Sequence, residues 1–288
     1  MHEQASFING KFIFSVGGVC CICRTAVEFR AERDDEISPK WYKHWFRGSL
    51  KCRQCGSLPR ERALFNAVEL FYPNWKDLRI HESSPVYRGA SRRFQDECPG
   101  YVKSQFDPAL PQGSIHPVKK YRSEDLEHQT FTDSSFDLVI TQDVFEHLFA
   151  PELAIAEIAR TLESGGAHIM TVPLVNGVEP SARRARLENG VVEYLQPAQY
   201  HGNPMSHDGS LVTMDWGYDI IDFLSYHSGT SVSLIQVENL YVGLYAVYND
   251  VLVCRKLRSV RSSEEPSLGQ SSVDTASLLR AVSEEPTA

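Results

Sequence analysis

The stretch that decides the fold reads SFDLVITQDVFEH and spans residues 135–147. Its first half, residues 136–141, is a compact run of apolar and β-branched side chains after turn-forming residues, a pattern typical of a strand buried on both faces of a sheet. Polar, acidic and aromatic residues begin where this run ends. Because ligands of open α/β sheets bind just beyond the carboxyl ends of the strands, this stretch predicts a buried strand and one wall of a binding site.

Helix-like and strand-like segments alternate on both sides of this strand. Residues 151–163 carry apolar side chains at helical spacing and end at Gly165-Gly166, and residues 167–172 read as the next strand. This alternation predicts a mostly parallel sheet with helices on both faces and an antiparallel hairpin at one edge. The other predicted segments are strands at 78–82, 101–106, 232–237 and 244–253, a helix from Ser84-Pro85 to about residue 97, and a helix from Asp215 to about residue 226.

The N-terminal region carries two pairs of cysteines, Cys20-x-x-Cys23 and Cys52-x-x-Cys55. Four thiolates at these spacings can surround one Zn²⁺ ion as a tetrahedron, and four protein ligands leave no open position, which indicates a structural site. Cys21 offers an alternative ligand, but only Cys20 has the two-residue spacing to Cys23. A module this small needs such a staple to fold, so the sequence predicts bound zinc.

Composition limits what the chain can be. The formal net charge of −8 over 288 residues argues against a broad nucleic-acid surface, which needs an excess of Lys and Arg. No apolar run approaches the roughly 20 residues that a membrane helix needs, and no signal peptide is evident at the N-terminus. We therefore expect a cytoplasmic protein, without a membrane partner, whose seven cysteines are thiols or metal ligands.

Three regions differ in character. We predict a zinc-binding module with a connecting helix over residues 1–72, an α/β domain over residues 73–258 and a disordered tail over residues 259–288. The tail consists mostly of Ser, Glu and small residues, which bury too little apolar surface to offset the entropy lost on ordering.

The run from residue 135 through the strand AHIMTVP, residues 167–173, resembles the class I S-adenosylmethionine-dependent methyltransferases. In that family D-s-F-D-l-v is followed by an acid, an E-H pair, a helix, a Gly-Gly turn and a strand. The resemblance covers about residues 76–256, and the cysteine module with CGSLPRER, residues 55–62, is similar to the zinc-binding leader of some members. It implies a Rossmann-like sheet with an antiparallel last strand, a small zinc-ribbon-like module and S-adenosylmethionine as cofactor.

The resemblance also implies a set of cofactor-binding residues that follow the carboxyl ends of strands. They are Glu82, Ser83, Ser84 and Gly89 in the first loop, Gln105 and Asp107 at the ribose, Asp125 and Leu126 at the adenine, and Gln142 and Asp143 at the methionine end. The first loop departs from the family's Gly-rich pattern, because residues 82–89 read ESSPVYRG. Either serine hydroxyls line a reshaped pocket, or the domain no longer binds the cofactor.

Histidines mark a candidate acceptor site. His147 is a candidate base or acceptor-positioning group, or it packs against the following helix, and Glu146 beside it reads as a local hydrogen-bond acceptor. The polar stretch YHGNPMSHDG, residues 200–209, lies where class I enzymes often insert acceptor-binding elements. His201, His207 and Asp208 are therefore candidate acceptor-binding residues, with His201 a second candidate for catalysis; a solvated loop with incidental histidines is the alternative.

These residues predict an enzyme that transfers a methyl group in line to a small molecule or glycan, with O-methylation favoured. Two alternatives stay open. The Ser-Ser-Pro loop fits a non-catalytic scaffold that recruits a protein partner through its zinc module. Basic residues around the cysteines fit a nucleic-acid methyltransferase; they are Arg24, Arg47, Lys51, Arg53, Arg60 and Arg62.

Overall fold

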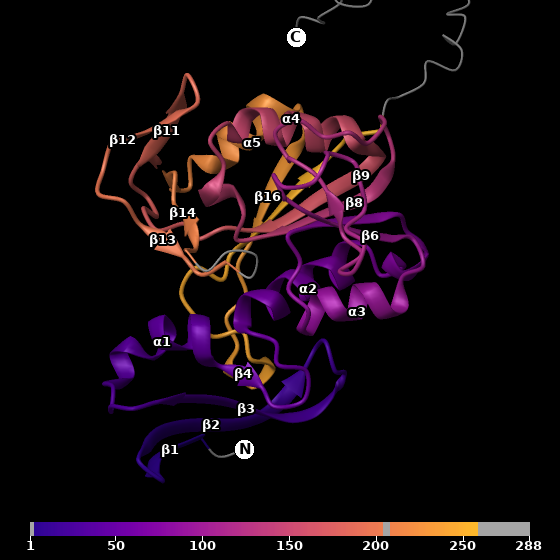
Figure 1. Ribbon diagram of the computed structural model, residues 1–288. Helices are drawn as coiled ribbons and strands as arrows, with labels where there is room; N and C mark the ends of the chain where they lie inside the picture. Colours follow the sequence, from indigo (N-terminus) through magenta and orange to yellow (C-terminus); the bar gives the residue numbers. More distant parts are fainter. Residues whose placement is uncertain (1–2, 204–207, 259–288) are drawn as a thin grey trace, which may run out of the picture. The chain divides into compact units, whose positions relative to one another are not determined.

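A seven-stranded sheet with the strand order β16-β17-β9-β8-β5-β6-β7 forms the centre of the structure (Figure 1). Strands β5 to β9 run parallel, whereas β17 runs antiparallel to both β9 and β16. The prediction of a Rossmann-like, mostly parallel sheet with an antiparallel last strand is therefore confirmed. The strands are β5 (Ile80–Ser83), β6 (Tyr101–Gln105), β7 (Arg122–Ser123), β8 (Phe136–Gln142), β9 (Leu162–Thr171), β16 (Ser231–Ile235) and β17 (Val251–Arg255).

The computed structural model describes residues 3–203 and 208–258. The chain up to Leu257 forms one compact unit. The predicted tail, residues 259–288, and the candidate acceptor residue His207 lie outside the described residues, and the domain boundary at residue 72 stays a prediction. Within the described ranges, no helix combines the length and the apolar composition needed to cross a membrane.

Helices cover both faces of the central sheet: α2 and α3 lie on one face, and α4 and α5 on the other (Figure 1). Successive side chains of β8 point to opposite faces of the sheet. Leu138 and Ile140 pack in the core between the sheet and α2 and α3, whereas Val139 packs in the core between the sheet and α4 and α5. The helices are α2 (Pro59–Phe71), α3 (Gly89–Glu97), α4 (Pro151–Thr161) and α5 (Ile220–Ser228), with 3₁₀ turns η2 (Trp75–Asp77) and η3 (Phe145–His147).

The start of α3 differs from the prediction. This helix begins at Gly89 and not at Ser84-Pro85. The backbone N–H of Gly89 donates to the carbonyl of Cys55 at 3.2 Å, and its φ of 53° is left-handed. A Cβ at this position would lie 2.9 Å from the Cβ of Ser57. Contact with the cysteine module therefore fixes where the helix begins, which the local sequence signal of the proline does not reveal.

The N-terminal module is a four-stranded antiparallel sheet with α1 (Tyr42–Ser49) packed beside it. Cys20 pairs with Thr25 at the end of the β2–β3 hairpin, so the first cysteine pair lies in the turn of that hairpin. The sequence predicted a small zinc-ribbon-like module but not these long strands. Its other elements are β1 (Glu3–Ile8), β2 (Lys11–Cys20), β3 (Thr25–Arg33), β4 (Lys51–Cys52) and the 3₁₀ turn η1 (Pro39–Trp41).

The connection between β16 and β17 leaves the central sheet and packs on this module. Its 3₁₀ turn η4 (Leu240–Val242) contacts β2 so closely that a Cβ on Gly18 would lie 2.0 Å from the carbonyl oxygen of Tyr241. Arg62 of α2 donates to the carbonyl of Gly243. The predicted strand over residues 244–253 is therefore wrong before Val251, because the module draws these residues away from the sheet.

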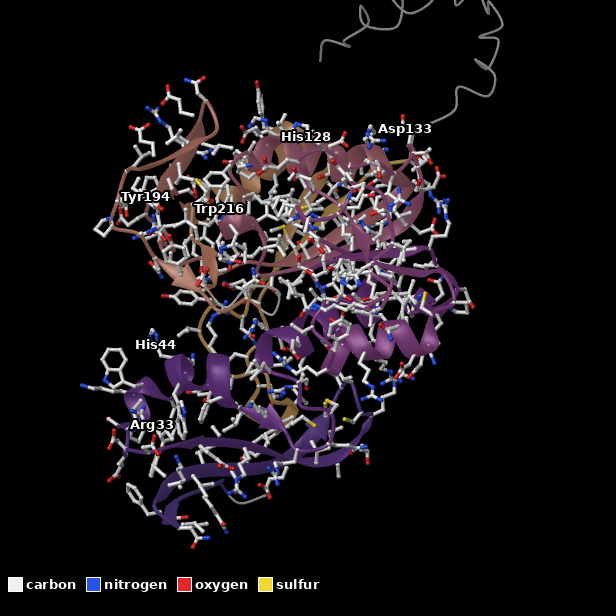
Figure 2. All side chains as sticks on the ribbon, viewed as in Figure 1. Arg33, His44, His128, Asp133, Tyr194 and Trp216 are labelled. Carbon is white, nitrogen blue, oxygen red and sulfur yellow. The ribbon has the colours of Figure 1, made fainter. Side chains whose placement is uncertain are left out.

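An insertion between β9 and α5 forms three two-stranded ribbons. Tyr194 lies on its outer side, whereas the buried ring of Trp216 packs against Phe223 of α5 (Figure 2). The predicted helix start at Asp215 is wrong, because Asp215 pairs with Ala182 in a ribbon and α5 begins five residues later. The ribbon strands are β10 (Ala182–Arg183), β11 (Ala185–Glu188), β12 (Val191–Tyr194), β13 (Tyr200–His201), β14 (Ser210–Leu211) and β15 (Met214–Asp215).

Candidate active site

Glu82 lies at the end of β5 and is fully buried. Its carboxylate accepts hydrogen bonds from the hydroxyl of Ser91 at 2.7 Å, the hydroxyl of Tyr101 at 2.8 Å and the amide of Gln142 at 2.8 Å. Burial raises its pKa to about 7, against the opposing effect of these three donors. The side chain thus ties α3, β6 and β8 together at the carboxyl edge of the sheet.

Gln142 has one hydrogen-bonding group left over. Its Nε2 donates to Glu82 and, at 3.1 Å, to Ser91, whereas its buried Oε1 has no partner among the described residues. A buried carbonyl oxygen without a donor costs about 1–3 kcal/mol. An ammonium group is a donor that would satisfy this oxygen and would also be attracted to Glu82. The methionine moiety of S-adenosylmethionine carries such a group, so these two residues fit the implied cofactor.

The first loop and the end of β6 supply the next predicted residues. Ser83 and Gln105 are buried at the ends of their strands, and Ser84 has a left-handed φ of 56°. A hollow of about 210 Å³ opens between residues 85–87 and α3, and its wall includes Ser91 and Tyr101, the hydroxyls that donate to Glu82. The structure therefore brings the first loop, Gln105 and the Glu82 network to one edge of the sheet.

The residues predicted at the adenine and ribose lie beyond β6 and β7. Leu126 is buried, and the carboxylate of Asp125 accepts from the backbone N–H of Glu127 at 2.9 Å. Asp107 accepts a hydrogen bond from the hydroxyl of Tyr121. That hydrogen bond lowers the pKa of Asp107, so the carboxylate is charged at neutral pH. Their roles toward a cofactor stay predictions.

Asp143 is held by the N-terminal part of the chain. Its Oδ2 lies 2.8 Å from both Arg47 of α1 and Arg60 of α2, and its Oδ1 accepts from Thr171 at 3.1 Å. The residue also adopts a left-handed φ of 51°, which is costly for a side chain other than glycine. The methionine end of the predicted site is therefore closed on one side by two arginines that the sequence did not connect with it.

The candidate acceptor residues lie beyond β8. His147 and His201 come from η3 and β13, and their rings meet edge to face with centroids 5.2 Å apart. Nδ1 of His147 lies 2.8 Å from the carbonyl oxygen of Leu211. The carboxylate of Glu146 lies 3.7 Å from each ring. The structure thus brings together two histidines that are far apart in sequence; Asp208 is exposed and lies two residues before β14.

The four predicted zinc ligands also lie together. Their sulfurs are all within 4.8 Å of one another, with 3.9 Å between Cys20 and Cys55 and 3.7 Å between Cys23 and Cys52. A zinc–sulfur distance of 2.3 Å gives a tetrahedron with edges of about 3.8 Å, which these separations match. The sulfur of Cys21 instead lies 3.5 Å from the carbonyl oxygen of Arg62. The geometry therefore fits a zinc ion held by the predicted set.

Three of the six basic residues around the cysteines, Arg47, Arg60 and Arg62, turn inward. Arg62 is fully buried and donates to the carbonyls of Ser57, Leu50 and Gly243. Arg24 pairs with Glu69, and Arg47 and Arg60 pair with Asp143. Lys51 and Arg53 are exposed. The cluster thus serves internal contacts in large part, which weakens its interpretation as a nucleic-acid surface.

Comparison with known proteins bears on the same region. Residues 104–170 match the family model of the methyltransferase domain. The segment from β6 to β9 is therefore similar to a methyltransferase domain. This confirms the enzyme class predicted from the sequence, while no curated protein sequence matches the chain.

Solved structures with a similar fold cover most of the chain. An S-adenosylmethionine-dependent methyltransferase from Mesorhizobium loti is 12% identical with a TM-score of 0.44, over 67% of this chain and 97% of that one. The 1,6-didemethyltoxoflavin-N1-methyltransferase from Burkholderia thailandensis, solved with S-adenosylhomocysteine, is 12% identical with a TM-score of 0.42, over 88% of this chain and 99% of that one.

Sequence reasoning missed several residues of this site. Ser91 and Tyr101 complete the Glu82 network, but neither belongs to a motif that would single it out. Glu146 was expected to accept a local hydrogen bond, yet both carboxylate oxygens are buried without a donor in the described residues. The adjacent Glu146-His147 pair was the sequence signal for this group. Its third member, His201, is brought to Glu146 by the fold.

Proposed function

We propose that the protein transfers a methyl group from S-adenosylmethionine to a hydroxyl group of a small molecule or glycan. The observation that carries this proposal is the pair Glu82 and Gln142, in which a buried carboxylate and an unsatisfied amide oxygen face a position suited to an ammonium group. The methyltransferase domain match, which includes Gln142, supports the same conclusion. The remaining cofactor residues proposed are Ser83, Ser84, Gly89, Gln105, Asp107, Asp125, Leu126 and Asp143.

When bound, S-adenosylmethionine supplies an electrophilic methyl group: the acceptor oxygen forms the new C–O bond as the C–S bond breaks, which leaves S-adenosylhomocysteine. The chain's own part is to align the two partners and to receive the hydroxyl proton. Since the carbonyl of Leu211 holds the Nδ1 proton of His147, Nε2 of this ring has a free lone pair for that proton. His201 and Asp208 would bind the rest of the acceptor.

The test is a calorimetric titration of the purified protein with S-adenosylmethionine, followed by a search for S-adenosylhomocysteine release with hydroxylated acceptors. We expect saturable binding that the Gln142→Met variant weakens by about tenfold, the order of one lost charge-assisted hydrogen bond. Gln112→Met is the matched control, since Gln112 is exposed and bonds only the carbonyl of His128 in the described structure. No binding by the wild-type protein would favour the non-catalytic scaffold instead.

The N-terminal module is proposed to hold a structural zinc ion through Cys20, Cys23, Cys52 and Cys55. Four thiolates around one Zn²⁺ carry a net negative charge, and the buried guanidinium of Arg62 lies beside them. The module also supplies Arg47 and Arg60 to Asp143, so the zinc ion would act on the candidate active site by keeping these arginines in place. Recruitment of a protein partner through the module stays a prediction.

A further inference from the structure

Glu146, His147 and His201 form a cluster whose ligand atoms all lie within 4.8 Å of one another. Two of its members adjoin in η3 and the third comes from β13, so the fold itself assembles the group. The cluster lies just beyond the carboxyl end of β8, four residues after Gln142. Carboxylate oxygen and imidazole nitrogen are ligands for divalent first-row transition metals.

Glu146 is the unusual member of this cluster. It is 1% exposed, and neither carboxylate oxygen has a hydrogen-bond donor among the described residues. Its Oε1 lies 3.7 Å from Nε2 of His147 and 3.7 Å from Nδ1 of His201, which is too long for a hydrogen bond. A buried carboxylate needs a compensating positive charge or donors. The space between Oε1 and the two ring nitrogens is where such a charge would lie.

The histidine rings are oriented for coordination. A carbonyl oxygen can only accept, so Nδ1 of His147 carries the proton that Leu211 receives at 2.8 Å, and Nε2 presents its lone pair toward Glu146. This is the arrangement of metal-binding histidines, in which the second ring nitrogen donates to a carbonyl group. In His201, Nδ1 lies 3.7 Å from Glu146 and offers its lone pair in the tautomer that carries the ring proton on Nε2.

The backbone around the cluster is firmly held. Thr213 donates to the carbonyl of Glu146 through its backbone N–H at 2.8 Å and its hydroxyl at 3.1 Å. Its hydroxyl also lies 2.6 Å from the carbonyl of Leu148. His201 is fixed by strand pairing with Ser210. The backbone segments that carry the ligands are therefore held by hydrogen bonds to neighbouring strands, as a preformed site requires.

A second carboxylate–imidazole group provides a contrast. Asp125, Glu127 and His128 also lie close together, but their carboxylates accept backbone hydrogen bonds, from Glu127 at 2.9 Å and from Ala150 at 2.8 Å. These carboxylates thus already have hydrogen-bond donors, whereas that of Glu146 has none among the described residues.

We propose that Glu146, His147 and His201 bind a divalent transition-metal cation, with the two imidazoles and the carboxylate on one side of the ion. The side chains of His147 and His201 are 18% and 37% exposed, so the other coordination positions face solvent and can take water or an oxygen of the acceptor. The cation binding stands on its own; its role in holding the acceptor's oxygen rests on the proposed function. With the ion bound, the lone pair of His147 Nε2 is a ligand, so the hydroxyl proton would pass to solvent water and not to this ring. Imidazole and carboxylate groups also bind zinc, so the two sites differ in their ligands: four thiolates in the cysteine cluster, and nitrogen and oxygen here.

Manganese is a suitable probe, because Mn²⁺ prefers oxygen and nitrogen ligands to thiolates and its free ion gives a strong paramagnetic resonance signal. Full-length protein whose zinc content is set to one ion per chain, enough for the four cysteines only, is titrated with Mn²⁺ without S-adenosylmethionine, and the free ion is measured. We expect one tight site per chain, weakened at least about tenfold in Glu146→Gln, His147→Ala and His201→Ala. Glu193→Gln and His227→Ala remove matched groups elsewhere and should bind like the wild type.

Zinc content and thermal unfolding of each variant show whether it has folded. If Glu146→Gln does not fold, His201→Ala is the deciding variant, because the His201 side chain is partly exposed and its removal should leave the fold intact. The proposal is overturned when the wild-type protein binds no Mn²⁺, or when a folded His201→Ala binds it as tightly as the wild type. A manganese site in a protein that never binds S-adenosylmethionine would sink the proposed function and leave the metal site intact.

Discussion

The guanidinium of Arg60 lies 2.8 Å from the carboxylate of Asp143 and so joins the first turn of α2 to the residue that follows β8. Arg47 of α1 reaches the same oxygen at 2.8 Å. Burial alone would raise the pKa of Asp143, but the two guanidinium charges outweigh it and hold the pKa below its usual value. One carboxylate therefore connects the cysteine module to the carboxyl edge of the sheet.

Removing this charge should destabilise the protein. In Asp143→Asn both guanidinium groups lose their ionic partner, and we expect the free energy of unfolding to fall by about 2–4 kcal/mol, because the three side chains are largely buried. Since the folded pKa is lowered, this stabilisation is present at neutral pH and is lost as the pH falls through the pKa of the folded carboxyl. Urea unfolding at pH 7 measures it.

The control for this variant is Asp133→Asn. Asp133 lies at the surface (Figure 2), 78% exposed, and pairs with Arg160 at 2.7 Å. A pair this exposed contributes less than about 1 kcal/mol, so the variant should differ little from the wild type. Equal effects of the two substitutions would show that the Asp143 pairs do not hold the module to the sheet.

Removal of zinc should unfold the N-terminal module. We expect one zinc ion per chain, loss of this zinc in Cys20→Ser, and a melting temperature lower by about 10 °C, the effect of losing roughly 3 kcal/mol in a domain of this size. Cys21→Ser is the matched variant: its sulfur points to the carbonyl of Arg62 and not to the cluster. Elemental analysis measures the zinc content of each variant. Zinc retained in Cys20→Ser but lost in Cys21→Ser would show that Cys21, and not Cys20, is the ligand.

Glu82 should make stability depend on pH in a defined direction. Its pKa is about 7 in the folded protein and about 4.3 in an unfolded chain. Between these values the unfolded chain has released the proton that the folded protein keeps, so raising the pH destabilises the folded state, by up to about 3 kcal/mol above pH 7. Glu82→Gln removes this titration. We expect its stability relative to the wild type to increase from pH 5 to pH 8.

Chemical unfolding of both proteins at several pH values gives this difference directly. The comparison is needed because the buried His81 and His168, whose pKa values burial lowers to about 3, destabilise the folded state at acidic pH in both proteins. A stability difference that stays constant from pH 5 to pH 8 would mean that Glu82 is already ionised when folded.

The central sheet could be predicted because its signals are local. The apolar run before Gln142 and the helix after Pro151 carry their structure in their own periodicity, and both begin where they were expected. The helix ends at Thr161, two residues early, and Gly165-Gly166 lie within β9 and not in a turn before it. The starts of α3 and β17 could not be predicted in this way. The first is set by the contact of Gly89 with Cys55, and the second by the packing of η4 on β2 and of Val247 on α1, contacts between segments far apart in sequence.

The residues of the candidate site also divide into those with a local sequence signal and those placed by long-range contacts. Glu82, Gln142 and the four cysteines were found because they follow strand ends or stand at characteristic spacings. The residues that bond to the carboxylates of the site were not found from the sequence. Tyr101, Arg47 and Arg60 reach Glu82 and Asp143 only because of the fold. His201 was selected from the composition of its loop, but its contact with Glu146 depends on a ribbon that the sequence does not reveal.

The packing of η4 on β2 can be tested with two glycines. A Cβ on Gly18 would lie 2.0 Å from the carbonyl oxygen of Tyr241, a backbone atom that cannot move aside cheaply, whereas a Cβ on Gly48 of α1 would meet nothing within 4 Å. We expect Gly18→Ala to lower the free energy of unfolding by about 1–3 kcal/mol through overpacking. Gly48→Ala should raise it by about 0.5–1 kcal/mol, since alanine favours a helix interior. The same denaturation experiment measures both free energies of unfolding. A Gly18→Ala protein as stable as the wild type would show that η4 does not pack on β2. That result would also remove the reason given for the late start of β17.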